Sequence, residues 1–140
     1  AYPKGGNGHM WSRLKEANDH GPVDILVLGS SLAYRGIDPR QFAAAGYTLF
    51  NLGSSSQTFI QTEVLVERYL DRFDPELIII EVDPWPFHTE GVESAVDLIA
   101  NGSLDLELLK MTCRVGNIKT FNEHFILSSN SSRTIIGITS

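Results

Sequence analysis

The chain has 140 residues, of which 42% are hydrophobic and 20% charged, as expected for a soluble globular protein with room for one domain. Its net charge is −6 and the sequence contains no basic stripe, which argues against nucleic acid as a partner. The single Cys113 excludes an intrachain disulfide and a cysteine-built metal cluster, and no apolar run is long enough to cross a membrane. No two histidines have the helical spacing of metal ligands, so no metal and no other cofactor is expected.

Residues 1–22 are predicted to form a helical lead-in to the domain. The chain begins with AYPKGG, without an initiator methionine or a signal peptide, which fits a segment downstream of a removed leader or of a membrane anchor outside this segment. Residues 10–18 predict a short helix with Trp11 and Leu14 on one side, and the sequence HGPVD then ends it.

Residues 23–84 have the pattern of a βαβαβ unit. Residues 24–28 (DILVL) are an unbroken apolar run, which predicts a strand covered on both faces. Asp38 and Pro39 predict the start of a helix that ends at Gly46, and residues 47–52 predict a second strand. A helix over 58–73 and a β-branched strand over 76–82 complete the unit. This order predicts an α/β fold with a parallel sheet and right-handed crossovers.

Residues 85–140 are predicted to be mostly helical, and the whole of 1–140 is predicted to be one domain. Residues 91–101 and 104–113 have helical patterns, whereas 117–127 fits either a helix or irregular structure. The last apolar stretch, TIIGI at 134–138, predicts a short strand and a natural protein that continues beyond it.

Three unusual loops leave the carboxyl ends of the predicted strands: GSSLAYRG (29–36), GSSSQT (53–58) and EVDPWPFH (81–88). These ends meet at one edge of a parallel sheet, where ligands bind in open α/β folds. The loops supply hydroxyls, backbone amides, carboxylates and an imidazole, which suits acyl or ester chemistry. Ser31 follows a tight turn at Gly29 and is the candidate nucleophile; the alternative is a serine that only caps the next turn.

Three sequence blocks, VLGSSLAYRGIDP, NLGSSSQT and PELIIIEVDP, carry a resemblance to the SGNH (GDSL-type) hydrolases. The chain is most similar to the branch that acts in cell-envelope polysaccharide acylation or deacylation, and the resemblance covers about residues 23–84. It implies a flavodoxin-like three-layer α/β/α fold and a serine esterase, acetyl-ester hydrolase or acyltransferase. It also implies an extracytoplasmic location and a small ester or glycan O-acyl group as substrate.

The resemblance assigns roles to residues in the first two blocks. It makes Ser31 the nucleophile, with its backbone amide in the oxyanion hole, and places Ser30 where the family has aspartate, after Gly29. In the second block, which includes Gly53, Ser56 occupies the place of the glycine that supplies another oxyanion amide. The chain departs from the family later. Trp85 stands where the oxyanion asparagine would fall, and no Asp-x-x-His precedes Ser140.

A base for Ser31 has to come from elsewhere in this sequence. His88 is the best candidate because Glu81 and Asp83 are near it in sequence; the alternative is a histidine on a surface loop. Strand alternation puts Glu81 and Asp83 on one face, where they orient a base, bind a sugar hydroxyl, cap the next segment or pair with a cation. Two further functions stay open: a binding or scaffold domain that lost the catalytic groups, and an anion-binding module built on the serine loops. The sequence does not predict the oligomeric state.

Overall fold

Three parallel strands form the centre of the fold in the computed structural model, which describes residues 9–83, 91–102 and 105–132. The described part is α/β, with seven helices around the sheet. Its elements in chain order are α1 (His9–Asp19), β1 (Ile25–Leu28), α2 (Ser31–Gly36), α3 (Pro39–Ala44), β2 (Leu49–Asn51), α4 (Phe59–Phe73), β3 (Leu77–Ile80), α5 (Val92–Asn101), α6 (Leu106–Val115) and α7 (Ile118–Ser132).

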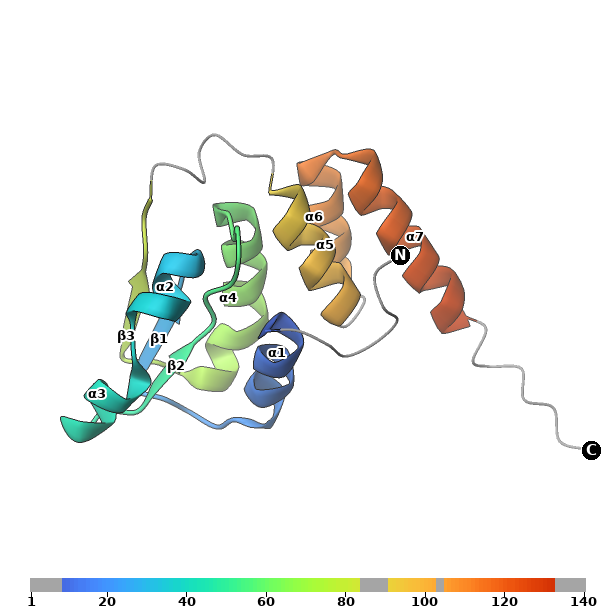
Figure 1. Ribbon diagram of the computed structural model, residues 1–140. Helices are drawn as coiled ribbons and strands as arrows, with labels where there is room; N and C mark the ends of the chain where they lie inside the picture. Colours follow the sequence, from blue (N-terminus) through green and yellow to red (C-terminus); the bar gives the residue numbers. More distant parts are fainter. Residues whose placement is uncertain (1–8, 84–90, 103–104, 133–140) are drawn as a thin grey trace, which may run out of the picture.

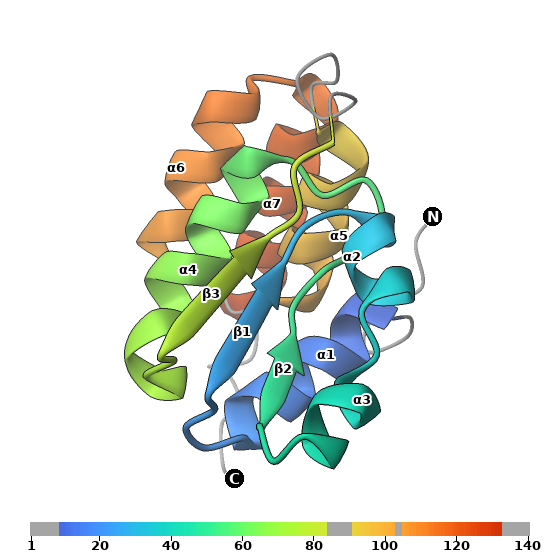
Figure 2. The same ribbon diagram turned by 90° about the vertical axis from the view of Figure 1, so that its left-hand side faces the viewer.

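The strand order is β2-β1-β3, with β1 in the middle and both pairings parallel. Ile25 of β1 lies opposite Leu49 of β2 on one side and Leu77 of β3 on the other. Helices α1 and α4 cover one face of the sheet, and α2 and α3 lie against the other (Figures 1 and 2). Helices α5, α6 and α7 pack behind α1 and α4, on the side away from the sheet (Figure 1).

Both faces of β1 are buried, which confirms the prediction from its unbroken apolar run. Leu26 and Leu28 enter the larger core, with Leu65 and Phe73 of α4, and with side chains of α1, α5 and α6. Ile25 enters a smaller core on the opposite face, beneath α2 and α3. The sheet therefore separates two hydrophobic cores, and side chains pack against both of its faces.

The predicted helices and strands of residues 9–83 are present, with ends that shift by one or two residues. Asp38 caps α3 by accepting a hydrogen bond from the Arg40 N–H, and Pro39 occupies the first turn, as predicted. The pattern left two possibilities for residues 117–127, and all of them except Asn117 belong to α7. The strand predicted at 134–138 lies outside the described residues.

One prediction for the first strand-end loop is wrong. Residues 31–36 were expected to be a loop, but they form the helix α2. The reason is local: the Ser30 hydroxyl accepts a hydrogen bond from the Leu32 N–H at 3.2 Å and so caps a short helix that contains the good helix formers Leu32, Ala33 and Arg35. Ser31 is consequently the first residue of a helix, fixed against the end of β1.

Candidate active site

A cleft of about 260 Å³ lies at the carboxyl ends of the strands, lined by Ser30, Ser31, Leu32, Ser56 and Asp83. The chain leaves β1 toward β2 and later returns to the opposite side of β1 as β3, so the strand order reverses at this point. Open α/β sheets bind ligands at such a reversal. The structure thus brings together residues from all three strand-end loops, although they are far apart in the sequence.

Ser31 lines this cleft from the first turn of α2, and it is half-buried. Within the described ranges its hydroxyl has no hydrogen-bond partner, and neither does its N–H, which belongs to the first helical turn. Its neighbour Ser30 is buried and occupied: the hydroxyl caps α2, and the N–H donates to Glu81 Oε2 at 2.8 Å. Ser31, but not Ser30, can therefore present both a hydroxyl and an amide to a ligand.

Glu81 fixes the turn that carries the two serines. Besides accepting from Ser30, it packs so closely on Gly29 that a Cβ at Gly29 would lie 2.7 Å from the Glu81 Cβ. Gly29 also has a φ of +146°, which side chains rarely adopt. Gly29 thus serves the close contact between β1 and β3, and Glu81 binds a backbone amide, a role that sequence reasoning had not considered.

The second serine loop packs directly against the first. The Ser54 N–H donates to the Gly29 carbonyl at 3.1 Å, and a Cβ on Gly53 would lie 3.0 Å from the Ala33 Cβ. The Gly53 N–H donates to Asn51 Oδ1 at 2.9 Å, so this amide is engaged inside the protein. Gly53 allows the two loops to approach each other, and with its amide bound to Asn51 its predicted role as an oxyanion or binding residue stays a prediction.

Ser56 has a left-handed backbone, with φ +54°, in the position where the resemblance expects glycine. Such a conformation costs a serine about 1 to 2 kcal/mol, so the surrounding contacts have to hold it. One of them is the hydrogen bond from its hydroxyl to Glu93 Oε2 at 3.2 Å. In the described part of the chain the Ser56 N–H has no acceptor, which leaves it as a donor beside the cleft.

The buried side chain of Asn51 connects α2 and the second serine loop, and its role was not predicted from the sequence. Its buried amide nitrogen donates to the carbonyls of Ala33 and Ile37, at 3.0 and 3.3 Å, while its oxygen accepts from Gly53. The available signal was an asparagine within the apolar stretch LFNL, at the end of β2. Asn51 therefore ties α2 to the second serine loop.

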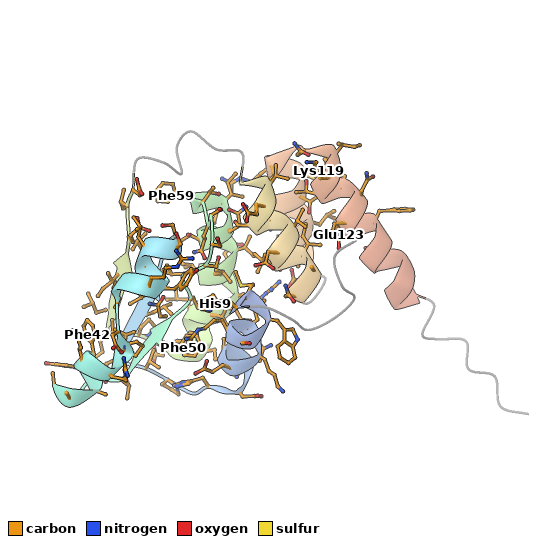
Figure 3. The ribbon with its side chains drawn as sticks, viewed as in Figure 1. His9, Phe42, Phe50, Phe59, Lys119 and Glu123 are labelled. Atoms are coloured by element: carbon orange, nitrogen blue, oxygen red, sulfur yellow. The ribbon has the colours of Figure 1, made fainter. Side chains whose placement is uncertain are left out.

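His88 lies outside the described residues, whereas His9 lies beside the second serine loop. The His9 ring stacks on Tyr34 with centroids 4.3 Å apart, and Nε2 is 3.3 Å from the Gly53 carbonyl oxygen. His9 extends from the start of α1 toward the sheet (Figure 3). Burial raises the pKa of Asp97, a residue close enough to His9 for their charges to interact. A hydrogen bond from Asn101 lowers this pKa, and smaller charge effects from Glu93 and His9 raise and lower it, respectively. His9 is not part of the cleft lining.

Two further observations concern only the residues that the structure describes. No three histidine, cysteine or acidic side chains among them are grouped so that they could hold a metal ion. No helix in these ranges combines the length and the apolar character needed to span a membrane.

Comparison with known proteins gives no match for this chain among family models, curated proteins or solved structures.

Proposed function

We propose that the chain is an SGNH-hydrolase-like domain with serine esterase, acetyl-ester hydrolase or acyltransferase activity on a small ester or a glycan O-acyl group. The observation that carries this proposal is the meeting of Ser31, Ser56 and Asp83 in one cleft at the strand ends. The order β2-β1-β3 supports it, since flavodoxin-like sheets begin with the strand order 2-1-3. The proposed extracytoplasmic location rests on the resemblance of the sequence to the cell-envelope branch of the SGNH hydrolases.

The chemistry assigned to Ser31 is nucleophilic attack on the acyl carbon. The Ser31 hydroxyl loses its proton to a base as its oxygen bonds to the carbonyl carbon, and the amides of Ser31 and Ser56 stabilise the oxyanion. Collapse of this intermediate releases the alcohol, which takes up the proton, and leaves an acyl-serine. Attack by water, or by an acceptor hydroxyl, then frees the enzyme. The proposed base is His88, which lies outside the described residues.

A second candidate function is a binding or scaffold domain with the same fold. It is favoured by the Ser31 hydroxyl, which has no base within hydrogen-bonding distance in the described ranges. It is also favoured by Glu81, whose Oε2 accepts a hydrogen bond from the Ser30 backbone amide and so has a role in holding the turn. In this case the cleft would bind a polar ligand through the free hydroxyl and amides without breaking a bond.

A fluorophosphonate probe separates the two functions, because it forms a stable bond only with an activated serine. The wild type, Ser31→Ala and Ser55→Ala are incubated with the probe, and bound label is measured by mass spectrometry. Ser55 is a suitable control because it is an exposed serine in the second loop and does not line the cleft. We expect labelling of the wild type and Ser55→Ala that is lost in Ser31→Ala. Absence of label on the wild type would exclude the esterase function and favour the binding domain.

A further inference from the structure

The second serine loop is held at both of its ends, and His9 provides one of the contacts at its start. At the end of the loop, the buried Gln57 donates a hydrogen bond to Thr62 at 2.9 Å. At the start, the Gly53 carbonyl oxygen lies 3.3 Å from His9 Nε2. Ser56, which lines the cleft, lies between these two anchors. A contact that fixes Gly53 therefore limits the positions open to the Ser56 amide.

The His9 ring contacts both of the segments that carry the cleft serines. It extends from the start of α1 (Figure 3) and stacks on Tyr34, which follows Ser31 by three residues on α2. The ring also reaches Gly53 in the second loop, and because a carbonyl oxygen only accepts, Nε2 has to carry the proton there. His9 therefore links the helix that carries Ser31 to the loop that carries Ser56.

The ionisable groups that face His9 come from α2 and α5, since residues 53–58 of the loop carry none. Asp97 of α5 is close enough for its charge to interact with that of His9, and it attracts a cationic ring. Arg35 of α2 repels one, because its guanidinium carbon lies 5.2 Å from the centre of the Tyr34 ring on which His9 stacks. The charged side chains four residues from Asp97 on α5 and from His9 on α1 are Glu93, which accepts from Ser56, and Arg13, which pairs with Glu16.

The hydrogen bond from His9 depends on pH in a way that the other anchors do not. Histidine is the side chain that ordinarily changes charge between about pH 5 and 8. A protonated ring makes the bond to the Gly53 carbonyl charge-assisted, and such bonds are about twice as strong as those between neutral groups. The bond from Gln57 to Thr62 joins neutral groups and is the same throughout this range. Protonation of His9 therefore strengthens the contact at the start of the loop.

We propose that His9 is a positioning residue of the strand-end cleft: it holds the second serine loop through the Gly53 carbonyl, and it holds the loop more firmly when its ring is protonated. A fall in pH then fixes the Ser56 amide more firmly beside the cleft. The consequence for the reactivity of Ser31 rests on the proposed esterase function, whereas the consequence for the loop does not.

Hydrogen exchange tests the effect on the loop without any substrate. The Ser54 N–H donates to the Gly29 carbonyl at 3.1 Å, so its protection from exchange reports how firmly the start of the loop is held. The Ile25 N–H, which is hydrogen-bonded at the start of β1, is the reference amide. Protection is measured for the wild type, His9→Gln and His9→Ala at about pH 8 and about pH 6, on either side of the ordinary histidine titration.

Glutamine keeps an N–H donor but does not titrate, so the two variants separate the hydrogen bond from the charge. We expect the wild type and His9→Gln to protect Ser54 equally at the higher pH and the wild type to protect it about fivefold more at the lower pH. His9→Ala should protect Ser54 less than the wild type at both. The matched control is His20→Gln, because the His20 Nδ1 lies 2.9 Å from the Gly21 carbonyl oxygen and not beside the cleft; it should behave as the wild type does.

Labelling of Ser31 by the fluorophosphonate probe tests the effect on the cleft. The labelling rate of the wild type is divided by that of His9→Gln at each pH, so that the titration of the base, which both proteins share, cancels. We expect this ratio to rise from about 1 at the higher pH to about 5 at the lower pH. The ratio of the wild type to His20→Gln should stay near 1 at both, as roughly equal rates follow from an unchanged loop.

Three results would overturn the proposal. If Ser54 protection has the same pH dependence in the wild type and in His9→Gln, the effect arises from another group, such as Asp97. If His9→Ala loses as much protection at Ile25 as at Ser54, His9 only stabilises the fold as a whole. If the wild type is labelled but the ratio does not change with pH, the esterase function stands and the role of His9 in the cleft does not. Absence of labelling together with the expected exchange result would exclude the esterase function and support the positioning role.

Discussion

Replacing Gly29 by alanine should damage the candidate site more than the same replacement at Gly36 or Gly53, the other glycines of the strand-end segments. The new Cβ would lie 2.7 Å from the Glu81 Cβ, 2.9 Å from Glu81 Oε2 and 3.0 Å from the Ala33 Cβ. The residue would also keep a φ of +146°, which alanine rarely adopts. Relief of these contacts requires Glu81 to move, and the hydrogen bond from the Ser30 N–H to Glu81 would then lengthen.

The expected loss of stability follows from these two effects. An unfavourable backbone conformation costs about 1 to 3 kcal/mol, and overpacking costs about 1 to 3 kcal/mol more. Together they give a loss of about 2 to 6 kcal/mol, which would remove a large part of the roughly 5 to 15 kcal/mol by which domains are stable. Urea denaturation followed by circular dichroism measures it. Gly36→Ala is the matched control, because a Cβ there meets nothing within 4 Å and the residue ends α2, so it should be neutral or slightly stabilising. Equal urea midpoints for the two variants would refute this reasoning.

Two other substitutions test the surroundings of the cleft. Asn51→Ala leaves the carbonyls of Ala33 and Ile37 and the N–H of Gly53 without this partner. We therefore expect urea denaturation to show a decrease of about 2 to 4 kcal/mol in the free energy of unfolding. A decrease below about 1 kcal/mol would contradict the role of Asn51 in connecting the two loops. Asp97→Asn should stabilise the protein near neutral pH, because burial raises the pKa of Asp97 and disfavours its charged form in the folded state. The wild type gains relative stability as the pH falls through this raised pKa toward the ordinary value of about 3.9, so the advantage of Asp97→Asn should shrink there; an advantage that does not change with pH would contradict the assignment.

The parts of the fold that the sequence predicted well are those with a local cause. The run DILVL indicated a strand buried on both faces, and β1 is the central strand. Asp38-Pro39 carries its own capping chemistry, and α3 begins there. Helix α2 was missed because it has only six residues, too few to show a periodic apolar face. The exposure of β3 was not predictable either, since an apolar strand has the same sequence pattern at an edge as at the centre.

The features of the site that could not be predicted are contacts between residues far apart in the sequence. The rule that parallel strands end at one edge brought the three loops together correctly, and Ser31, Ser56 and Asp83 share a cleft. The partners of Asn51 and His9, 18 and 44 residues away, depend on packing that no short motif contains. The same is true of Glu81, whose carboxylate reaches an amide 51 residues away.

Buried polar side chains hold the second serine loop in one conformation. Ser54 donates to Gln57, Gln57 donates to Thr62, and Gln61 donates to the Gly91 carbonyl at the start of α5. Apolar side chains would fill this space as well, but they would not fix the left-handed backbone of Ser56. With Glu81 holding the first loop, the amides of Ser31 and Ser56 and the Ser31 hydroxyl, for which the described part of the chain offers no partner, are positioned beside the cleft before any ligand arrives. Such preorganisation is what an oxyanion site requires, and it would serve a polar ligand equally, so the two candidate functions share this scaffold and differ in whether a base reaches Ser31.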